Sequence, residues 1–379
     1  MPRTADVVVV GGGIVGLCVA HQLRARRLRV VVVERGRCGQ GSTARATGGI
    51  RTQFGTEVNV RLSLRSLVHF REWPDRYGGD AGYRPIGYLF LATTPSQVEQ
   101  LRRGVALQRA CGARNQLLDR DEVARGLPGV VLDDVLAAAF GPDDGLGDPG
   151  AAVTSLVSAC RRAGVEVLEE TPMVRLQLDG GRPAGVVTRR GRIAAEAVVL
   201  ATGVWTAPIA RRLGLELPIA PHHRQVYRTR TAPGVPDRCP LTVDLGSGVY
   251  FHRDGPGLIF GGGDRVGEPG WDDRFRPEEA PRIVELLTRR LPAMADAELA
   301  GGWAGLREMT PDDLAAVGPL PGLDRVHVAA GFSGHGFMHA PAVGEIVAAG
   351  LCREAPPVDV SALDPARFQR QLQAEAYVF

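Results

Sequence analysis

The N-terminal part of the chain alternates between apolar runs and one glycine-rich turn. Residues 6–10 form a short apolar run, three glycines follow at 11–13, and residues 14–23 place apolar side chains at helical spacing. A second apolar run, at 28–33, ends at Glu34. Short apolar runs bounded by turn residues predict strands, and the periodic stretch between them predicts a helix. The chain is therefore expected to open with a strand–turn–helix–strand unit.

The rest of the chain predicts shorter elements separated by turns. Residues 36–56 are rich in Gly, Ser, Thr and Arg, which predicts a loop with a short helix. Pro149, in the first turn, favours a helix over residues 151–163. The predicted helices are residues 57–72, 151–163, 277–291 and 340–351. The predicted strands are residues 83–93, 130–140, 165–168, 173–178, 183–189, 197–201, 222–231, 241–243, 249–252, 258–262 and 326–330.

Length and connectivity favour two interleaved domains. A chain of 379 residues exceeds what one compact core usually holds. The closely spaced strands between residues 222 and 262 predict an antiparallel sheet, whereas the opening unit predicts a parallel α/β layer. No linker divides the chain, so each domain is expected to be assembled from separated segments.

Charge and cysteine placement exclude several classes of protein. The net charge is +3 and all 45 basic residues are arginines, scattered without a polybasic block, which argues against a nucleic-acid partner. No apolar run is long enough for a membrane span, and no charged leader precedes an apolar segment, so we expect neither a span nor a signal peptide. The six cysteines form no Cys-x-x-Cys pair and no zinc spacing. That distribution favours reduced thiols, a cytoplasmic location and no metal site.

The opening turn carries a dinucleotide-binding pattern. Gly11, Gly13 and Gly16 follow a strand and open a helix, and Glu34 ends the next strand. Gly11 permits the tight turn, Gly13 lets the backbone approach a pyrophosphate, and Gly16 allows close packing of helix and sheet. Glu34 can accept hydrogen bonds from a ribose. This pattern alone suits NAD and FAD equally well.

Four further motifs narrow the choice of cofactor. Residues 198–203 end an apolar strand in a small-residue turn, residues 41–51 read GSTARATGGIR, and residues 329–337 read AAGFSGHGF. Trp-Ala-Gly-Leu-Arg at 303–307 is followed by Thr-Pro-Asp at 310–312. In this order, over nearly the whole chain, the motifs make it resemble the D-amino-acid oxidase superfamily of flavoenzymes. The branch it resembles most contains the sarcosine oxidases, glycine oxidases and dimethylglycine dehydrogenases.

The resemblance implies an organisation and a cofactor. A Rossmann-like FAD-binding domain is expected from residues 1–80, 141–215 and 300–379, interleaved with an α+β substrate domain from 81–140 and 216–299. The cofactor-binding residues that it implies are Gly11, Gly13, Ile14, Val15, Gly16, Glu34, Arg35, Ser42, Thr43, Arg45, Thr47, Gly48, Gly49, Val174, Ala201, Thr202, Gly203, Trp205, Arg307, Gly331, Gly334, His335, Gly336, Phe337 and Met338.

Particular segments are expected at particular parts of the flavin. Ser42, Thr43 and Arg45 would meet the pyrophosphate and the ribityl chain. Backbone N–H groups of residues 334–337, at a helix start, would point at the N1 and C2-carbonyl edge of the ring. Such donors, with the helix dipole, stabilise the anionic reduced flavin.

The resemblance also implies a substrate site. Arg307 matches the arginine that grips the carboxylate in glycine oxidase-like relatives, and Arg51 is expected near the flavin or the substrate. A guanidinium suits a carboxylate because it donates two parallel charge-assisted hydrogen bonds. Tyr250 and His252, on one face of a predicted strand, are the other catalytic candidates. His222 and His223 are adjacent on a strand and point to opposite faces, so a metal site there is disfavoured.

The implied reaction transfers a hydride from a small amine or amino acid to flavin N5, giving an imine that hydrolyses. Some relatives attach the flavin through a cysteine, where this chain has residues 306–309. Others attach it through a histidine, where this chain has Arg45. The FAD is therefore expected to be non-covalent. Relatives that reduce oxygen place a lysine where Ile259 stands here. We therefore slightly favour a dehydrogenase, passing electrons to a carrier or partner subunit, over an oxidase that uses O2.

Three alternatives remain open at this point. A 2-hydroxy acid would need a general base near N5, with His252 and His335 as candidates. The second alternative is that the chain is the flavin subunit of a larger amine-oxidising complex. A tailoring enzyme acting on a bulky amine is the third, and the oligomeric state is left open.

Overall fold

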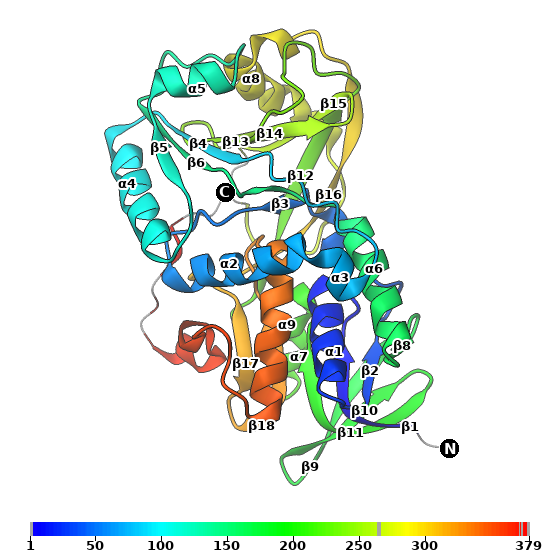
Figure 1. The fold of residues 1–379 in the computed structure, drawn as a ribbon. Helices are drawn as coiled ribbons and strands as arrows, with labels where there is room; N and C mark the ends of the chain where they lie inside the picture. The colour runs from blue at the N-terminus through cyan, green and yellow to red at the C-terminus, as the bar shows by residue number, and fades with distance from the viewer. Residues whose placement is uncertain (1–2, 264–266, 371, 373, 377–379) are drawn as a thin grey trace.

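Two mixed layers of helices and sheet make up the molecule (Figure 1). The computed structural model describes residues 3–263, 267–370, 372 and 374–376. Each layer contains an eight-stranded sheet, and a two-stranded sheet of β3 (Gly49–Ile50) and β7 (Gly145–Leu146) lies between them. This mixed α/β architecture is the one that the sequence predicts. No helix in the described part of the chain is long and apolar enough to cross a membrane.

The first sheet is parallel at its centre. Its order is β17-β18-β11-β1-β2-β8, with the hairpin of β9 and β10 attached to β11. The opening apolar runs form neighbouring strands, and their side chains are almost completely buried. The strands are β1 (Arg3–Val10), β2 (Val30–Val33), β8 (Glu166–Leu168), β9 (Met173–Asp179), β10 (Arg182–Thr188), β11 (Gly191–Leu200), β17 (Ala316–Leu320) and β18 (Leu323–Ala330).

Helices on this layer include two that follow glycine turns. β1 and β18 both run parallel to β11, so the helices that follow them start at the same edge of the sheet. These helices, α1 and α9, lie side by side below α2 in Figure 1. The helices are α1 (Ile14–Ala25), α2 (Glu57–Arg71), α3 (Trp73–Tyr77), α6 (Pro149–Arg162), α7 (Thr206–Arg211) and α9 (Gly336–Cys352).

The second sheet has the order β16-β12-β15-β14-β13-β4-β6-β5 and is antiparallel except where β13 pairs with β4. One face packs against a separate apolar core that includes α8, and the other faces the first layer. Its strands are β4 (Tyr88–Ala92), β5 (Gln116–Leu118), β6 (Ala137–Gly141), β12 (Ala220–Thr229), β13 (Leu241–Asp244), β14 (Val249–Asp254), β15 (Gly257–Gly262) and β16 (Leu299–Met309). Its helices are α4 (Pro95–Ala110), α5 (Arg120–Gly126) and α8 (Ala280–Arg290).

The structure departs from the expected elements in several places. α4, α5, β5, β16 and β17 were not predicted, and α9 begins at Gly336 rather than 340, with Pro341 inside it. The expected division into domains changes by one strand. β16 pairs along β12 in the second sheet, although 300–379 was expected in the first unit. We therefore propose that the boundary lies after Met309.

α1 and α9 approach each other closely at a glycine. A Cβ atom on Gly344 would stand 2.8 Å from the carbonyl carbon of Cys18 and 2.9 Å from its Cβ. Real Cβ atoms do not approach backbone so closely, so the two helices depend on glycine here. Their spacing sets how the two helix N-termini lie relative to each other.

A buried polar network anchors the segment after β3. Asp144 accepts hydrogen bonds from the Thr52 backbone N–H, the Thr52 hydroxyl and the Gln53 amide, at 2.8, 2.8 and 3.1 Å. Asn115 donates to the same hydroxyl, and its amide also donates to Gln108. Burial raises the pKa of Asp144 to about 6, although the hydrogen bonds from Thr52 and Gln53 oppose the rise. The network ties this segment to the second sheet.

We predict that Gly344→Ala lowers the free energy of unfolding by about 1–3 kcal/mol, because the added methyl group forces the two helices apart. Gly126→Ala is the control, since a Cβ at this exposed helical position would meet nothing within 4 Å. That control should leave stability unchanged or raise it by up to about 1 kcal/mol. Urea unfolding measures both. Equal behaviour of the two variants would contradict the close approach.

We also predict that Asp144 makes stability fall as pH rises from 4 to 6. The native carboxyl holds its proton more tightly than the unfolded one, so unfolding releases a proton in this window. Asp144 should account for about 1–3 kcal/mol of this loss, so the fall in stability should be smaller by that amount in Asp144→Asn.

Asp143→Asn is the matched control for this pH series. Hydrogen bonding to Arg114 lowers the pKa of Asp143, so its own contribution is lost only as pH falls below the usual carboxyl range. Its variant should keep the wild-type slope between pH 4 and 6. Urea unfolding at several pH values would disprove the assignment if Asp144→Asn kept that slope as well.

Candidate active site

A cleft lies where the edge of the first sheet meets the open face of the second. It is lined by both helix N-termini, the 42–51 loop and strands of the second sheet. The lining residues that the sequence predicts are Ile14, Val15, Ser42, Thr43, Arg45, Thr47, Gly48, Gly49, Arg51, Tyr250, Arg307, Gly334, His335, Gly336, Phe337 and Met338. Those that it does not predict are Ala46, Tyr88, Arg224, Val226, Leu241, Val243, Trp303, Gly305, Leu306, Glu308, Phe332 and Ser333.

The first glycine turn packs as its spacing requires. Gly11 has φ +108°, and a Cβ there would lie 2.2 Å from the Ala201 carbonyl oxygen. A Cβ on Gly16 would lie 2.0 Å from the Gly11 carbonyl oxygen. Gly13 caps α1 without a side-chain hydrogen bond, and the first turn holds no acidic residue. This N-terminus, with Thr43 accepting from the Ile14 N–H at 3.2 Å, fits a pyrophosphate.

The acid at the end of β2 organises the turn itself. The Glu34 carboxylate accepts from the backbone N–H of Gly12 at 2.7 Å and of Gly36 at 2.9 Å. Nearby, the Arg35 guanidinium lies 3.5 Å from the centre of the Trp205 ring. Glu34, Arg35, Trp205 and Val174 were all expected at the cofactor, but none lines the cleft. Val174 is 46% exposed on β9.

The second glycine turn joins β18 to α9. Ser333 and Gly334 have φ of +48° and +95°, and His335 caps the helix without a side-chain hydrogen bond. Ser333 is fully buried in a conformation that side chains rarely adopt, so the surrounding packing must hold it there. A Cβ on Gly334 would stand 2.9 Å from Arg307 Nε. The Arg307 side chain therefore lies against this turn, beside the uncapped N-terminus of α9.

Both helix N-termini thus present backbone donors to one cleft, and the glycines leave room above them. The two positive helix ends suit an elongated cofactor that carries negative charge on a pyrophosphate and on one edge of a ring. Gly48, Gly49 and Gly334 have no side chains that would block this cofactor. The residues present therefore fit FAD.

The opposite wall is one face of the second sheet. Across it, Gly305 pairs with Arg224, Val226 pairs with Gly261, and Gly261 pairs with Tyr250. Because side chains alternate along a strand, the cleft-facing positions of neighbouring strands line up. The Tyr250 hydroxyl lies 2.8 Å from where a Gly261 Cβ would be. Glycine at 261 therefore leaves room for the tyrosine ring to lie over the neighbouring strand.

Arg51 is buried and held from several sides. Its guanidinium donates to the Gln53 carbonyl, lies 4.1 Å from the centre of the Phe54 ring, and has Nη2 3.3 Å from His335 Nε2. Arginine has no acceptor, so His335 Nε2 must accept this bond. Burial, and then the charge of Arg51, holds the pKa of His335 well below its usual value. His335 is therefore neutral at physiological pH.

Arg45 is occupied by protein groups. Its guanidinium donates to the carbonyl oxygens of Ala304 and Gln40, both at 2.9 Å, and pairs with Asp273 at 3.2 Å. The pyrophosphate contact expected for Arg45 stays a prediction. In this structure its stem crosses Gly305 and ties the 42–51 loop to β16.

Arg307 and Glu308, adjacent in the sequence, both have pKa values shifted by burial. Burial, and then repulsion from Arg224, lowers the pKa of Arg307 to about 10, which leaves it charged at neutral pH. Burial raises the pKa of Glu308 to about 7, opposed by hydrogen bonds from the backbone N–H groups of Gly331 and Phe332. Among the described lining residues Glu308 is the one carboxyl group, so the cleft is strongly positive.

His252 lies outside the cleft. It is buried, its Nδ1 bonds the Arg253 carbonyl at 2.9 Å, and it lies two residues further along β14 than Tyr250. The alternation of side chains along a strand was used to place Tyr250 and His252 on one face of β14. The same reasoning on β12 and β4 would have predicted Arg224 and Tyr88 as residues that line the cleft. No local signal marks Glu308. Among the described residues, no group of His, Cys, Asp and Glu is placed to hold a metal ion.

Comparison with known proteins agrees with this geometry. The chain is 31% identical to glycine oxidase of Geobacillus kaustophilus (strain HTA426), over 92% of this chain and 93% of that one. It is 28% identical to mitochondrial dimethylglycine dehydrogenase of Rattus norvegicus, covering 96% of this chain but only 45% of the relative's length. The solved L-proline dehydrogenase from P. horikoshii superposes with a TM-score of 0.92 at 33% identity, covering 98% of this chain and all of that one.

A family model described as DAO, FAD dependent oxidoreductase, matches residues 6–349, which include both glycine turns and every strand of the second sheet. The match covers most of the chain, and the uncapped helix N-termini fit the cofactor that defines the family. The chain belongs to the DAO family of FAD-dependent oxidoreductases.

Proposed function

We propose that this enzyme oxidises a small amine or amino acid that carries a carboxylate, and that Arg307 binds this carboxylate with Arg51 nearby. The observation that carries the proposal is the position of Arg307. It lies on the sheet wall against Gly334, where the N-terminus of α9 opens into the cleft. Similarity to glycine oxidase, dimethylglycine dehydrogenase and L-proline dehydrogenase supports the same class of substrate.

The arginines orient the substrate. A guanidinium holds a carboxylate through two parallel hydrogen bonds, which sets the direction of the bond to be oxidised. Gln53, Phe54 and His335 hold Arg51 in place before any substrate arrives. Little ordering of the side chain is then needed on binding.

The same charges keep the substrate amine neutral. Hydride loss needs the nitrogen lone pair, which an ammonium group lacks. Nearby cations and burial both disfavour the ammonium form, and Arg51, Arg224 and Arg307 all line the cleft. Tyr88, Tyr250 and Trp303 add aromatic surface that limits water. FAD, when bound, supplies the hydride acceptor.

The remaining details follow from side chains at the cleft. No cysteine lines it among the described residues, and its lining histidine, His335, is bonded to Arg51, which supports non-covalent FAD. Ile259 is buried in the sheet and the chain has no lysine, so we propose a dehydrogenase in preference to an oxidase. Oxidation of a 2-hydroxy acid is less favoured, because His252 lies outside the cleft and the neutral His335 already accepts from Arg51.

The reaction class is tested by anaerobic reduction of the FAD-reconstituted protein. Amino acids and N-methyl amino acids should bleach the visible flavin absorbance, and 2-hydroxy acids should not. Readmitting air should restore the colour slowly for a dehydrogenase and rapidly for an oxidase. Bleaching by hydroxy acids alone would contradict the proposal.

We predict that Arg307→Met raises the KM for the amino acid about 10- to 100-fold, because one charge-assisted pair of hydrogen bonds is lost. Arg307→Lys should recover only part of the loss, since an ammonium group lacks the planar fork. Arg228→Gln, at an exposed position on β12, is the control and should leave KM unchanged. An unchanged KM in Arg307→Met would remove Arg307 from the substrate site.

A further inference from the structure

The cleft carries more positive charge than one substrate carboxylate requires. Arg45, Arg51, Arg224 and Arg307 all line it. Asp273 forms an ion pair with Arg45. The Glu308 carboxyl accepts a hydrogen bond from the Gly331 N–H at 3.0 Å. A cation that is partly removed from water is costly unless an anion or a dense set of acceptors meets it.

Arg224 and Arg307 face the cleft side by side. Arg224 on β12 pairs with Gly305 on β16, and Arg307 follows Gly305 by two residues. Two such positions are diagonal neighbours on the same face of an antiparallel pair, about 7–8 Å apart. Gly305 has no side chain to separate them, and Arg224 is the charge that most lowers the pKa of Arg307.

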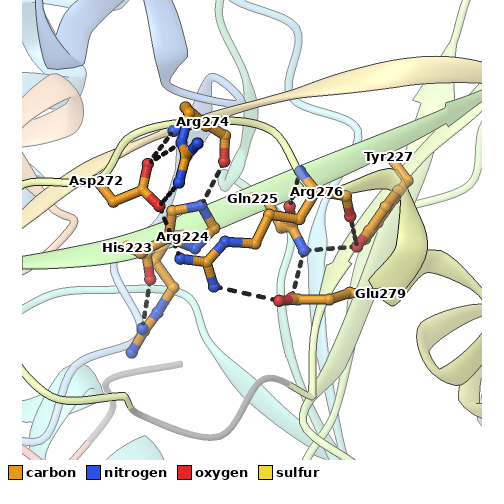
Figure 2. Close-up of polar contacts among 8 residues, drawn as sticks. All are labelled: His223, Arg224, Gln225, Tyr227, Asp272, Arg274, Arg276 and Glu279. Atoms are coloured by element: carbon orange, nitrogen blue, oxygen red, sulfur yellow. Dashed lines mark hydrogen bonds and ion pairs between the residues drawn. The ribbon is translucent and has the colours of Figure 1, made fainter.

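Two acidic groups of the loop above Arg224, Asp272 and Glu279, already pair with arginines of that loop. Asp272 binds Arg274 at 2.8 Å and Arg276 at 3.1 Å, and Glu279 binds Arg276 at 3.2 Å. Figure 2 shows Arg224 pointing away from both acids, toward the side opposite the loop.

Among the residues that the structure describes, the guanidinium of Arg224 has a single protein acceptor. Its Nη1 donates to the carbonyl oxygen of His223, its own neighbour, at 2.8 Å. Within the described part of the chain no carboxylate pairs with it. One backbone carbonyl leaves most of the five guanidinium N–H donors directed elsewhere, and the side chain lines the cleft.

We propose that the substrate is an amino acid with a second carboxylate, and that Arg224 binds this second carboxylate while Arg307 binds the first. The inference rests on the proposed function and adds a substrate class to it. The two guanidinium groups then act as a pair, one for each end of a short dicarboxylate. A monocarboxylate would leave Arg224 without an anion.

The main competing role for Arg224 is contact with the cofactor phosphates. The uncapped N-terminus of α1, with Thr43, already forms a site for that group. Arg224 lies instead beside Arg307 and Val226 on the sheet wall. Measuring FAD affinity separately from ligand affinity distinguishes the two roles.

The test uses FAD-reconstituted protein and unreactive carboxylates that perturb the flavin spectrum. Succinate is compared with butyrate, and glutarate with valerate, so that chain length is matched and only the second carboxylate differs. In the wild type the better dicarboxylate should bind at least about tenfold more tightly than its monocarboxylate. Arg224→Gln should abolish that preference by weakening dicarboxylate binding much more than monocarboxylate binding, and Arg224→Lys should restore part of the preference.

Arg228→Gln on the same strand is the control and should keep the wild-type preference. Equal binding of mono- and dicarboxylates by the wild type would overturn the proposal, and so would a loss of FAD affinity in Arg224→Gln comparable to the loss of ligand affinity. Failure of the proposed function has a different signature: no amine would bleach the flavin, and Arg307→Met would bind butyrate as well as the wild type does.

Discussion

The parallel pairing of β1, β11 and β18 is the constraint on which the rest of the site depends. Because the outer two strands run in the same direction beside β11, α1 and α9 both begin at one edge of the sheet. Gly11 makes this possible at one point, where its Cα packs directly on the Ala201 carbonyl. Gly344 makes it possible at another, where the two helices touch. Two positive helix ends then share one space, and an anionic cofactor is the natural occupant.

The second sheet completes the site by adding charge of the same sign. Arg307 and Arg224 project from its open face, and Arg51 reaches the cleft from the segment that Asp144 anchors. Like charges gathered in this way cost stability in the free protein and favour anions when these bind. The loop from Asp272 to Glu279 shows the contrast, because each of its arginines already has an acidic partner (Figure 2).

Local chemistry made much of this predictable from the sequence. The glycine pattern and the start of α1 each depend on a few neighbouring residues, and Arg307 was selected through the family motif around it. What sequence reasoning missed depends on contacts between distant segments. Pairing of β12 with β16 brings Arg224 beside Arg307, and it also moves β16 out of the expected domain. Glu34 and Arg45 each hydrogen-bond to backbone groups of other segments, which sequence reasoning did not predict, and their contacts with the cofactor stay predictions. His252 has the right residue type and strand face, yet lies too far along β14 to line the cleft.

Every cation on the walls of this cleft is a guanidinium, and the chain contains no lysine at all. The amine oxidation proposed above, followed by imine hydrolysis, would release an aldehyde or a keto acid. Such carbonyl compounds condense with lysine amines to form Schiff bases, whereas an arginine side chain remains protonated and lacks a free nitrogen lone pair. The carbonyl product of the proposed reaction would therefore meet no lysine amine in this chain.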